Sequence, residues 1–194
     1  MARLIAGVII AAVVLYLFGF VYWGMGPYAT VIWKQAADDE AAGTALARHF
    51  PENGTYFVPA IKPDMETTNR LAEKGPVAFV HMIAVDGKPM TDPSIMIGGF
   101  FLNLVAIVLI ALLVKLAAPA VPTYAARVGF VALAGLAAAV FSEGNEAVWW
   151  QISWEWKLYQ AVYSVAFWII AGVILAAFIQ AEPPKISVAQ TRAG

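Results

Sequence analysis

The residues best suited to chemistry in this chain are acidic and aromatic side chains that follow one another after position 142. Glu143 and Glu146 are three positions apart, so on a helix they would share one face. Trp149, Trp150 and Trp154 come directly after them. Rigid aromatic rings at a membrane surface, with carboxylates beside them, could line a pocket for a quinone or a lipid headgroup. These five residues therefore form the candidate ligand-binding site.

Each part of this candidate site also has a structural interpretation, and the sequence leaves both open. Tryptophan gathers at membrane interfaces because its ring is apolar and its N–H can reach water, so the segment can be an aromatic belt. The two glutamates could hold a proton or a divalent cation, but oxygen-only metal sites usually need more ligands than one carboxylate pair. Their alternative is an ordinary ion pair, with Lys157 as the nearest cation in the sequence.

Several kinds of function are disfavoured by composition. The chain has no cysteine, which excludes disulfides, thiol nucleophiles and cysteine-bound metals. Its only histidines, His49 and His81, fall in separate predicted elements, and no Gly-x-Ser-x-Gly motif occurs. The net charge of −1 gives no electrostatic basis for binding nucleic acid. We therefore expect no catalytic residue, no metal site and no cofactor, and the chain is interpreted as a non-enzyme.

Four apolar stretches must position any site, and they cover residues 4–23, 97–117, 124–142 and 158–179. Each is close to the roughly 20 residues that a helix needs to cross a bilayer. Asn103 is the one strongly polar residue well inside a stretch, and we expect it to bond to a neighbouring helix. No ionisable residue lies in the middle of a stretch, which argues against a pump or an ion-coupled transporter.

The fold predicted from this pattern is an all-α four-helix membrane bundle with a small α+β extramembrane domain between helices 1 and 2. Helix 1 occupies residues 1–23, the small domain 24–96, and helices 2–4 residues 97–182, with an aromatic outer loop at 143–157 and a tail at 183–194. In the small domain we expect an extended piece at 28–33, helices at 36–50 and 65–74, strands at 55–59 and 76–85, and a return strand after the Asp86-Gly87 turn. The small-residue-rich helix at 124–142 should be the most buried of the four.

Charge predicts the orientation in the membrane. Arg3, Lys115, Arg127, Lys185 and Arg192 flank one side of the predicted spans, where Glu182 is the only acid. Short segments rich in Lys and Arg stay in the cytoplasm. We therefore expect a multi-pass protein of the bacterial inner membrane, with both termini cytoplasmic and the small domain periplasmic.

Short motifs add a resemblance to this interpretation. Gly54–Pro59 reads Gly-x-Tyr-Phe-x-Pro, residues 74–77 read Lys-Gly-Pro-Val, and Pro89-Met90 leads to a Gly99-Phe100 helix start. In this order, with one span before and three after, the chain resembles a group of uncharacterised bacterial four-helix inner-membrane proteins with a periplasmic insert. The resemblance implies no activity and assigns no residue a role.

The function expected from the sequence is that of an accessory or structural subunit of a larger membrane complex, respiratory or photosynthetic. Its partners would be membrane lipid and other membrane-protein subunits. The alternative is a lipid- or quinone-binding membrane protein with its site at the periplasmic aromatic rim.

Overall fold

The structure is a computed structural model, and it describes residues 2–180, so the tail predicted at 183–194 lies outside the described residues. The described chain is mostly helical, with one small two-stranded sheet. It divides into two compact units. We call the chain up to Ile32 and from Pro93 onward the membrane unit, and Trp33–Asp92 the small unit.

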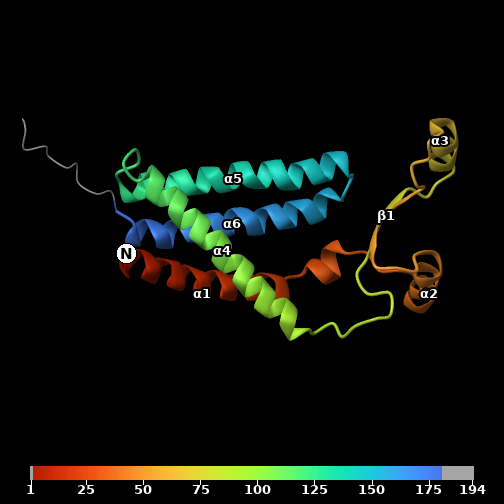
Figure 1. Cartoon of the computed structure of the whole chain (residues 1–194), viewed down its shortest axis with the longest axis horizontal. Helices are drawn as coiled ribbons and strands as arrows, with labels where there is room; N and C mark the ends of the chain where they lie inside the picture. Colours follow the sequence, from red (N-terminus) through yellow and green to blue (C-terminus); the bar gives the residue numbers. More distant parts are fainter. Residues whose placement is uncertain (1, 181–194) are drawn as a thin grey trace, which may run out of the picture. The chain divides into compact units, whose positions relative to one another are not determined.

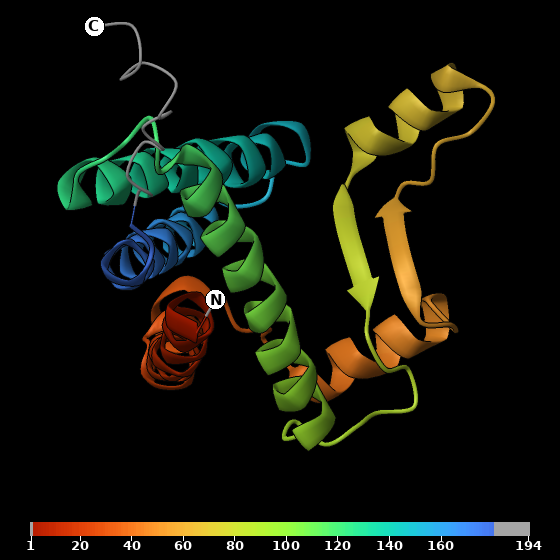
Figure 2. The ribbon, with the colours of Figure 1, turned by 60° about the vertical axis from the view of Figure 1, so that its left-hand side comes forward.

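The membrane unit contains four helices that are long and apolar enough to cross a membrane, as the sequence predicts. They are α1 (Ala2–Met25), α4 (Pro93–Ala117), α5 (Tyr124–Trp149) and α6 (Trp154–Phe178). Helix α6 contacts each of the other three, most extensively α5. Helices α1, α5 and α6 run alongside one another, and α4 (green in Figures 1 and 2) crosses them obliquely. Helix α6 is therefore the centre of the unit.

The core of the membrane unit lies between α1, α4 and α6, where Leu15, Ile107 and Leu175 are fully buried. Small residues bring the backbones close together. A Cβ added at Gly135 of α5 would overlap Trp168 of α6, and one at Gly7 of α1 would overlap Phe178. Close packing of this kind drives helix association in lipid. The expectation that the helix at 124–142 is the most buried is wrong, since 28% of the apolar window is buried in α1 and in α6, and only 22% in α5.

Two segments of the membrane unit differ from the sequence prediction. The expected extended piece at 28–33 is instead a short π-helix, η1 (Tyr28–Ile32). The expected loop at 143–157 is largely helical, because α5 continues to Trp149 and α6 begins at Trp154. Asn145 Nδ2 donates a 2.5 Å hydrogen bond to the Phe141 carbonyl one turn back. The polar residues after 142 thus continue the helix instead of ending it.

The small unit consists of α2 (Asp39–His49), β1 (Gly54–Val58), α3 (Met65–Lys74) and β2 (Ala78–Met82). The strands are antiparallel, and Thr55 faces His81 while Phe57 faces Phe79. Asp38 and Asp64 cap the two helices by accepting backbone hydrogen bonds from Ala41 and from Glu66 and Thr67. The expected return strand after Asp86-Gly87 is absent from the described residues, where the sheet has β1 and β2 alone.

Burial in the small unit is sparse. Thr68 is the one buried residue described between Trp33 and Asp92, and every buried apolar side chain described in the chain lies in the membrane unit. Phe57, Phe79, Val77 and Ile83 are 43–64% exposed. By the alternation of a strand, these four side chains share one face of the sheet and its continuation with the polar pair Thr55 and His81. The small unit therefore exposes several apolar side chains on one face and, in its described residues, has no fully buried apolar side chain.

Candidate functional site

The two candidate glutamates meet a buried lysine between α5 and α6. Lys157, in the first turns of α6, is only 3% exposed. Its Nζ lies 2.6 Å from Glu143 Oε2 and 2.5 Å from Glu146 Oε2. It also donates to Gln160 Oε1 at 2.5 Å. A lysine ammonium has three N–H donors, so these three acceptors use all of them. The ion pair to Lys157 that the sequence offered as the alternative is present.

The three candidate tryptophans lie where α5 ends and α6 begins, and their side chains are exposed. Trp149, Trp150 and Trp154 are 76%, 58% and 54% exposed. Such exposure suits an aromatic belt at the membrane interface. Their role in ligand binding, and that of Glu143 and Glu146, stays a prediction.

Two of the five candidates line an apolar groove between α5 and α6. The groove has a volume of about 620 Å³ and is walled by aliphatic side chains such as Leu136, Ala161 and Val165. Glu143, Lys157 and Trp154 lie on its lining, whereas Trp149, Trp150 and Glu146 do not. The structure thus separates the candidate set into groove residues and surface residues.

Sequence reasoning missed an aromatic cluster between α1, η1 and α6. Tyr22 Oη donates to the Tyr159 carbonyl at 2.8 Å, and Tyr159 Oη donates to the Tyr22 carbonyl at 2.9 Å. Around this reciprocal pair, the rings of Trp23 and Tyr163 lie 5.1 Å apart, and those of Trp23 and Trp156 lie 5.7 Å apart. The tyrosines were visible in the sequence, but no signal showed that α1 and α6 are neighbours.

Asn103 lies in a different environment from the one expected. It is half-buried on α4, and among the residues that the structure describes no hydrogen bond joins its carboxamide to a neighbouring helix. It lines an open cavity of about 420 Å³ between α1, α4 and α6, together with Tyr16, Trp23 and Tyr163. The expected helix-to-helix bond is therefore not formed.

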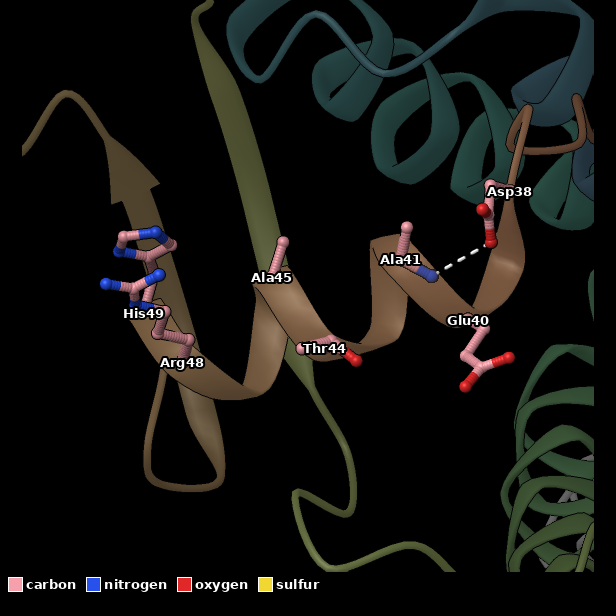
Figure 3. A pocket seen from close by; sticks show the side chains of 7 residues that line it. All are labelled: Asp38, Glu40, Ala41, Thr44, Ala45, Arg48 and His49. Atoms are coloured by element: carbon pink, nitrogen blue, oxygen red, sulfur yellow. Dashed lines mark hydrogen bonds between the residues drawn. The ribbon is translucent and has the colours of Figure 1, made fainter.

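In the small unit, a hollow of about 480 Å³ runs along α2 (Figure 3). Its lining side chains run from Asp38 to His49 along a single helix, and the one bond drawn is the cap from Ala41 N to Asp38. A hollow bounded by one helix cannot enclose a ligand. His81 is exposed, and its Nδ1 lies 2.9 Å from Thr55 Oγ1. Between residues 2 and 180, no group of three or more acidic or histidine side chains could hold a metal ion.

Comparison with known proteins adds nothing to these observations. No protein-family model, no curated protein and no solved structure matches the chain. Any functional conclusion therefore depends on the geometry of the chain itself. The described chain presents an apolar groove with an ion-pair cluster at its end, an open cavity lined by aromatic rings, and a sheet face with exposed apolar side chains.

Proposed function

We propose that this chain is a non-enzymatic integral membrane protein that acts as an accessory or structural subunit of a larger assembly in the bacterial inner membrane, such as a respiratory or photosynthetic complex. In this proposal both termini are cytoplasmic and the small unit is periplasmic. The positive charges beside the spans support that orientation.

The observation that carries this proposal is the absence of a buried apolar side chain from the described small unit. A domain of this size folds alone only when it buries a large share of its apolar surface. Here Phe57 and Phe79 pair across the strands, with ring centroids 6.4 Å apart, and remain about half exposed. Aromatic side chains on such a face are the residues that dominate protein interfaces. A partner that covers this face would complete the missing core.

The test is purification of the tagged full-length chain from native membranes in a mild detergent, followed by mass spectrometry of the proteins that accompany it. We expect one stoichiometric membrane-protein partner. The double variant Phe57→Ser/Phe79→Ser should reduce recovery of that partner by about tenfold or more, because truncating one central aromatic residue commonly costs about 2 kcal/mol of binding.

The matched control is Met90→Ser, because Met90 is a 96% exposed apolar side chain of the small unit that lies outside the sheet. This control should retain the partner. Equal recovery from the double variant and the unchanged chain would contradict the proposal, as would a chain that emerges alone from every native membrane preparation.

A second candidate function is binding of a lipid or quinone at the outer aromatic rim, and the α5–α6 groove favours it. The groove is apolar along its length and ends at Glu143, Lys157 and Trp154. Ala161→Phe would fill the groove, whereas Ala137→Phe would place the same ring on an exposed position of α5 outside its lining. If the groove holds a lipid, co-purified lipid should fall in the first variant alone.

A further inference from the structure

The cavity at Asn103 lies where the bilayer interior would be. Asn103 is ten positions after Pro93, the first residue of α4. It is six positions after residue 97, where the apolar stretch begins, so at about 1.5 Å per residue it lies about 9 Å inside a hydrocarbon core of ~30 Å. A carboxamide without a partner at this depth is costly, because neither water nor lipid tails supply a hydrogen bond. The cavity therefore contains a carboxamide that has no hydrogen-bond partner among the described residues.

The walls of this cavity are rich in aromatic side chains. Tyr16, Trp23 and Tyr163 supply aromatic faces and edges from α1 and α6. A Cβ added at Gly99 of α4, or at Gly24 of α1, would meet no atom within 4 Å, so these lining glycines leave open space. The volume of about 420 Å³ falls within the range of roughly 300–1,000 Å³ that is typical of small-molecule sites.

The polar groups of the cavity select the chemistry of its occupant. Tyr16 Oη donates to the Met96 carbonyl at 3.3 Å, so its proton is already used. The Asn103 amide has two N–H donors, and no described group accepts from them. The ligand that fits is an apolar molecule with a flat ring and a carbonyl oxygen placed to accept from Asn103.

We propose that the cavity between α1, α4 and α6 binds the ring of a lipophilic quinone, with Asn103 Nδ2 donating to a ring carbonyl. The aromatic walls pack against the ring, and the isoprenoid tail extends into the lipid. This inference deepens the second candidate function, ligand binding, and places the site at Asn103 instead of at Glu143 and the tryptophans. It is independent of the accessory role, which the partner-recovery experiment tests separately.

The experiment is native mass spectrometry of the full-length chain in mild detergent, titrated with decylubiquinone and, as a matched ligand without carbonyls, decylbenzene. We expect saturable binding of one quinone and clearly weaker binding of decylbenzene. Asn103→Leu keeps the side-chain size and removes the amide. It should weaken quinone binding about tenfold, which corresponds to ~1.4 kcal/mol, and leave decylbenzene binding unchanged.

Two adjacent glycines provide the control for occupancy of the cavity. Gly99 lines the cavity and Gly98 does not, yet a side chain at either position meets no atom within 4 Å. Gly99→Leu should abolish quinone binding, and Gly98→Leu should retain it. Thermal unfolding of both variants verifies that they are folded.

Three results would overturn the proposal. They are equal binding of the two ligands, quinone binding that both glycine variants retain, and quinone binding lost from Ala161→Phe but not from Gly99→Leu. The last result would place the ligand in the α5–α6 groove, which leaves the second candidate function standing and removes this site.

Discussion

The membrane unit and the small unit of this chain achieve order in different ways. In the membrane unit, side chains from separate helices interlock, as at Gly135 against Trp168, and a core of fully buried residues results. In the small unit, order comes from local hydrogen bonds, namely the helix caps at Asp38 and Asp64 and the pairing of two short strands. Local hydrogen bonds each contribute only about 1 kcal/mol. The comparison indicates that the first unit has a buried core of its own and that the second has none in its described residues, and under the proposed function a partner would cover the second.

The largest expected effect concerns the Lys157 ion cluster, which the membrane unit has and the small unit lacks in its described residues. Lys157→Met leaves Glu143 and Glu146 without their cation. We expect the free energy of unfolding to fall by about 2–3 kcal/mol, at or below the low end for a broken buried pair, because Glu146 is half exposed to solvent. Equilibrium unfolding of the variant and the unchanged chain in detergent measures this difference in free energy.

A triple variant serves as the control for this prediction. Adding Glu143→Gln and Glu146→Gln to Lys157→Met removes the uncompensated charge, so most of the lost stability should return. If the triple variant is no more stable than Lys157→Met alone, the loss comes from packing of the lysine stem and not from charge.

The next effect tests close packing directly. Gly135→Ala forces a methyl group against Trp168, and overpacking of this kind costs about 1–3 kcal/mol. Gly129→Ala lies in the same helix with nothing within 4 Å, so it should be neutral or slightly stabilising. The unfolding midpoints of the two variants provide the measurement. Equal midpoints would show that α5 and α6 are not held by this contact.

A smaller effect is expected at the reciprocal tyrosine pair. Tyr22→Phe and Tyr159→Phe each remove one hydrogen bond between α1 and α6, at a cost of about 0.5–1.5 kcal/mol. Because the two bonds share both residues, the double variant should cost less than the sum of the single variants. Strict additivity in this double-mutant cycle would mean that the two bonds are independent.

The smallest effect belongs to the small unit and depends on pH. The hydroxyl of Thr67, followed by backbone N–H groups, lowers the pKa of Asp64 below its usual value. A carboxyl group whose pKa is lowered by folding stabilises the fold above its unfolded pKa of about 3.9, and this stabilisation is lost as the pH falls through the lowered value.

Amide signals of α3 followed by NMR should therefore weaken in acid only below about pH 4. Asp64→Asn retains a capping side chain but does not titrate there, so it should remove most of this dependence. An unchanged acid transition in Asp64→Asn would show that another group causes it.

Sequence reasoning predicted the features that depend on local pattern. The four spans, the helix at 65–74 and its cap at Asp64 with Gly75 behind it all follow from hydropathy or from capping chemistry. Gly75 has a φ of +61°, a conformation that glycine adopts without strain. The Lys157 partner of the glutamates also followed from closeness in the sequence.

Features that depend on which helices are neighbours could not be predicted. Tyr22 and Tyr159 are 137 positions apart, and hydropathy does not state that α1 lies against α6. The expected bond of Asn103 failed for the same reason, because that part of α4 borders a cavity. The continuation of α5 to Trp149 was missed because Glu143 to Glu146 are polar, and polarity marks the edge of the hydrocarbon but not the end of a helix.

Hydrogen exchange of the full-length chain, compared between native membranes and the purified protein, tests the central claim most directly. A unit without its own core opens easily, so its amides exchange fast unless a partner covers it. We predict that β1 and β2 are protected in native membranes and lose this protection on purification, while α5 and α6 keep theirs. Strong protection of both strands in the purified chain would contradict the account, because it would show that the small unit is stable without a partner.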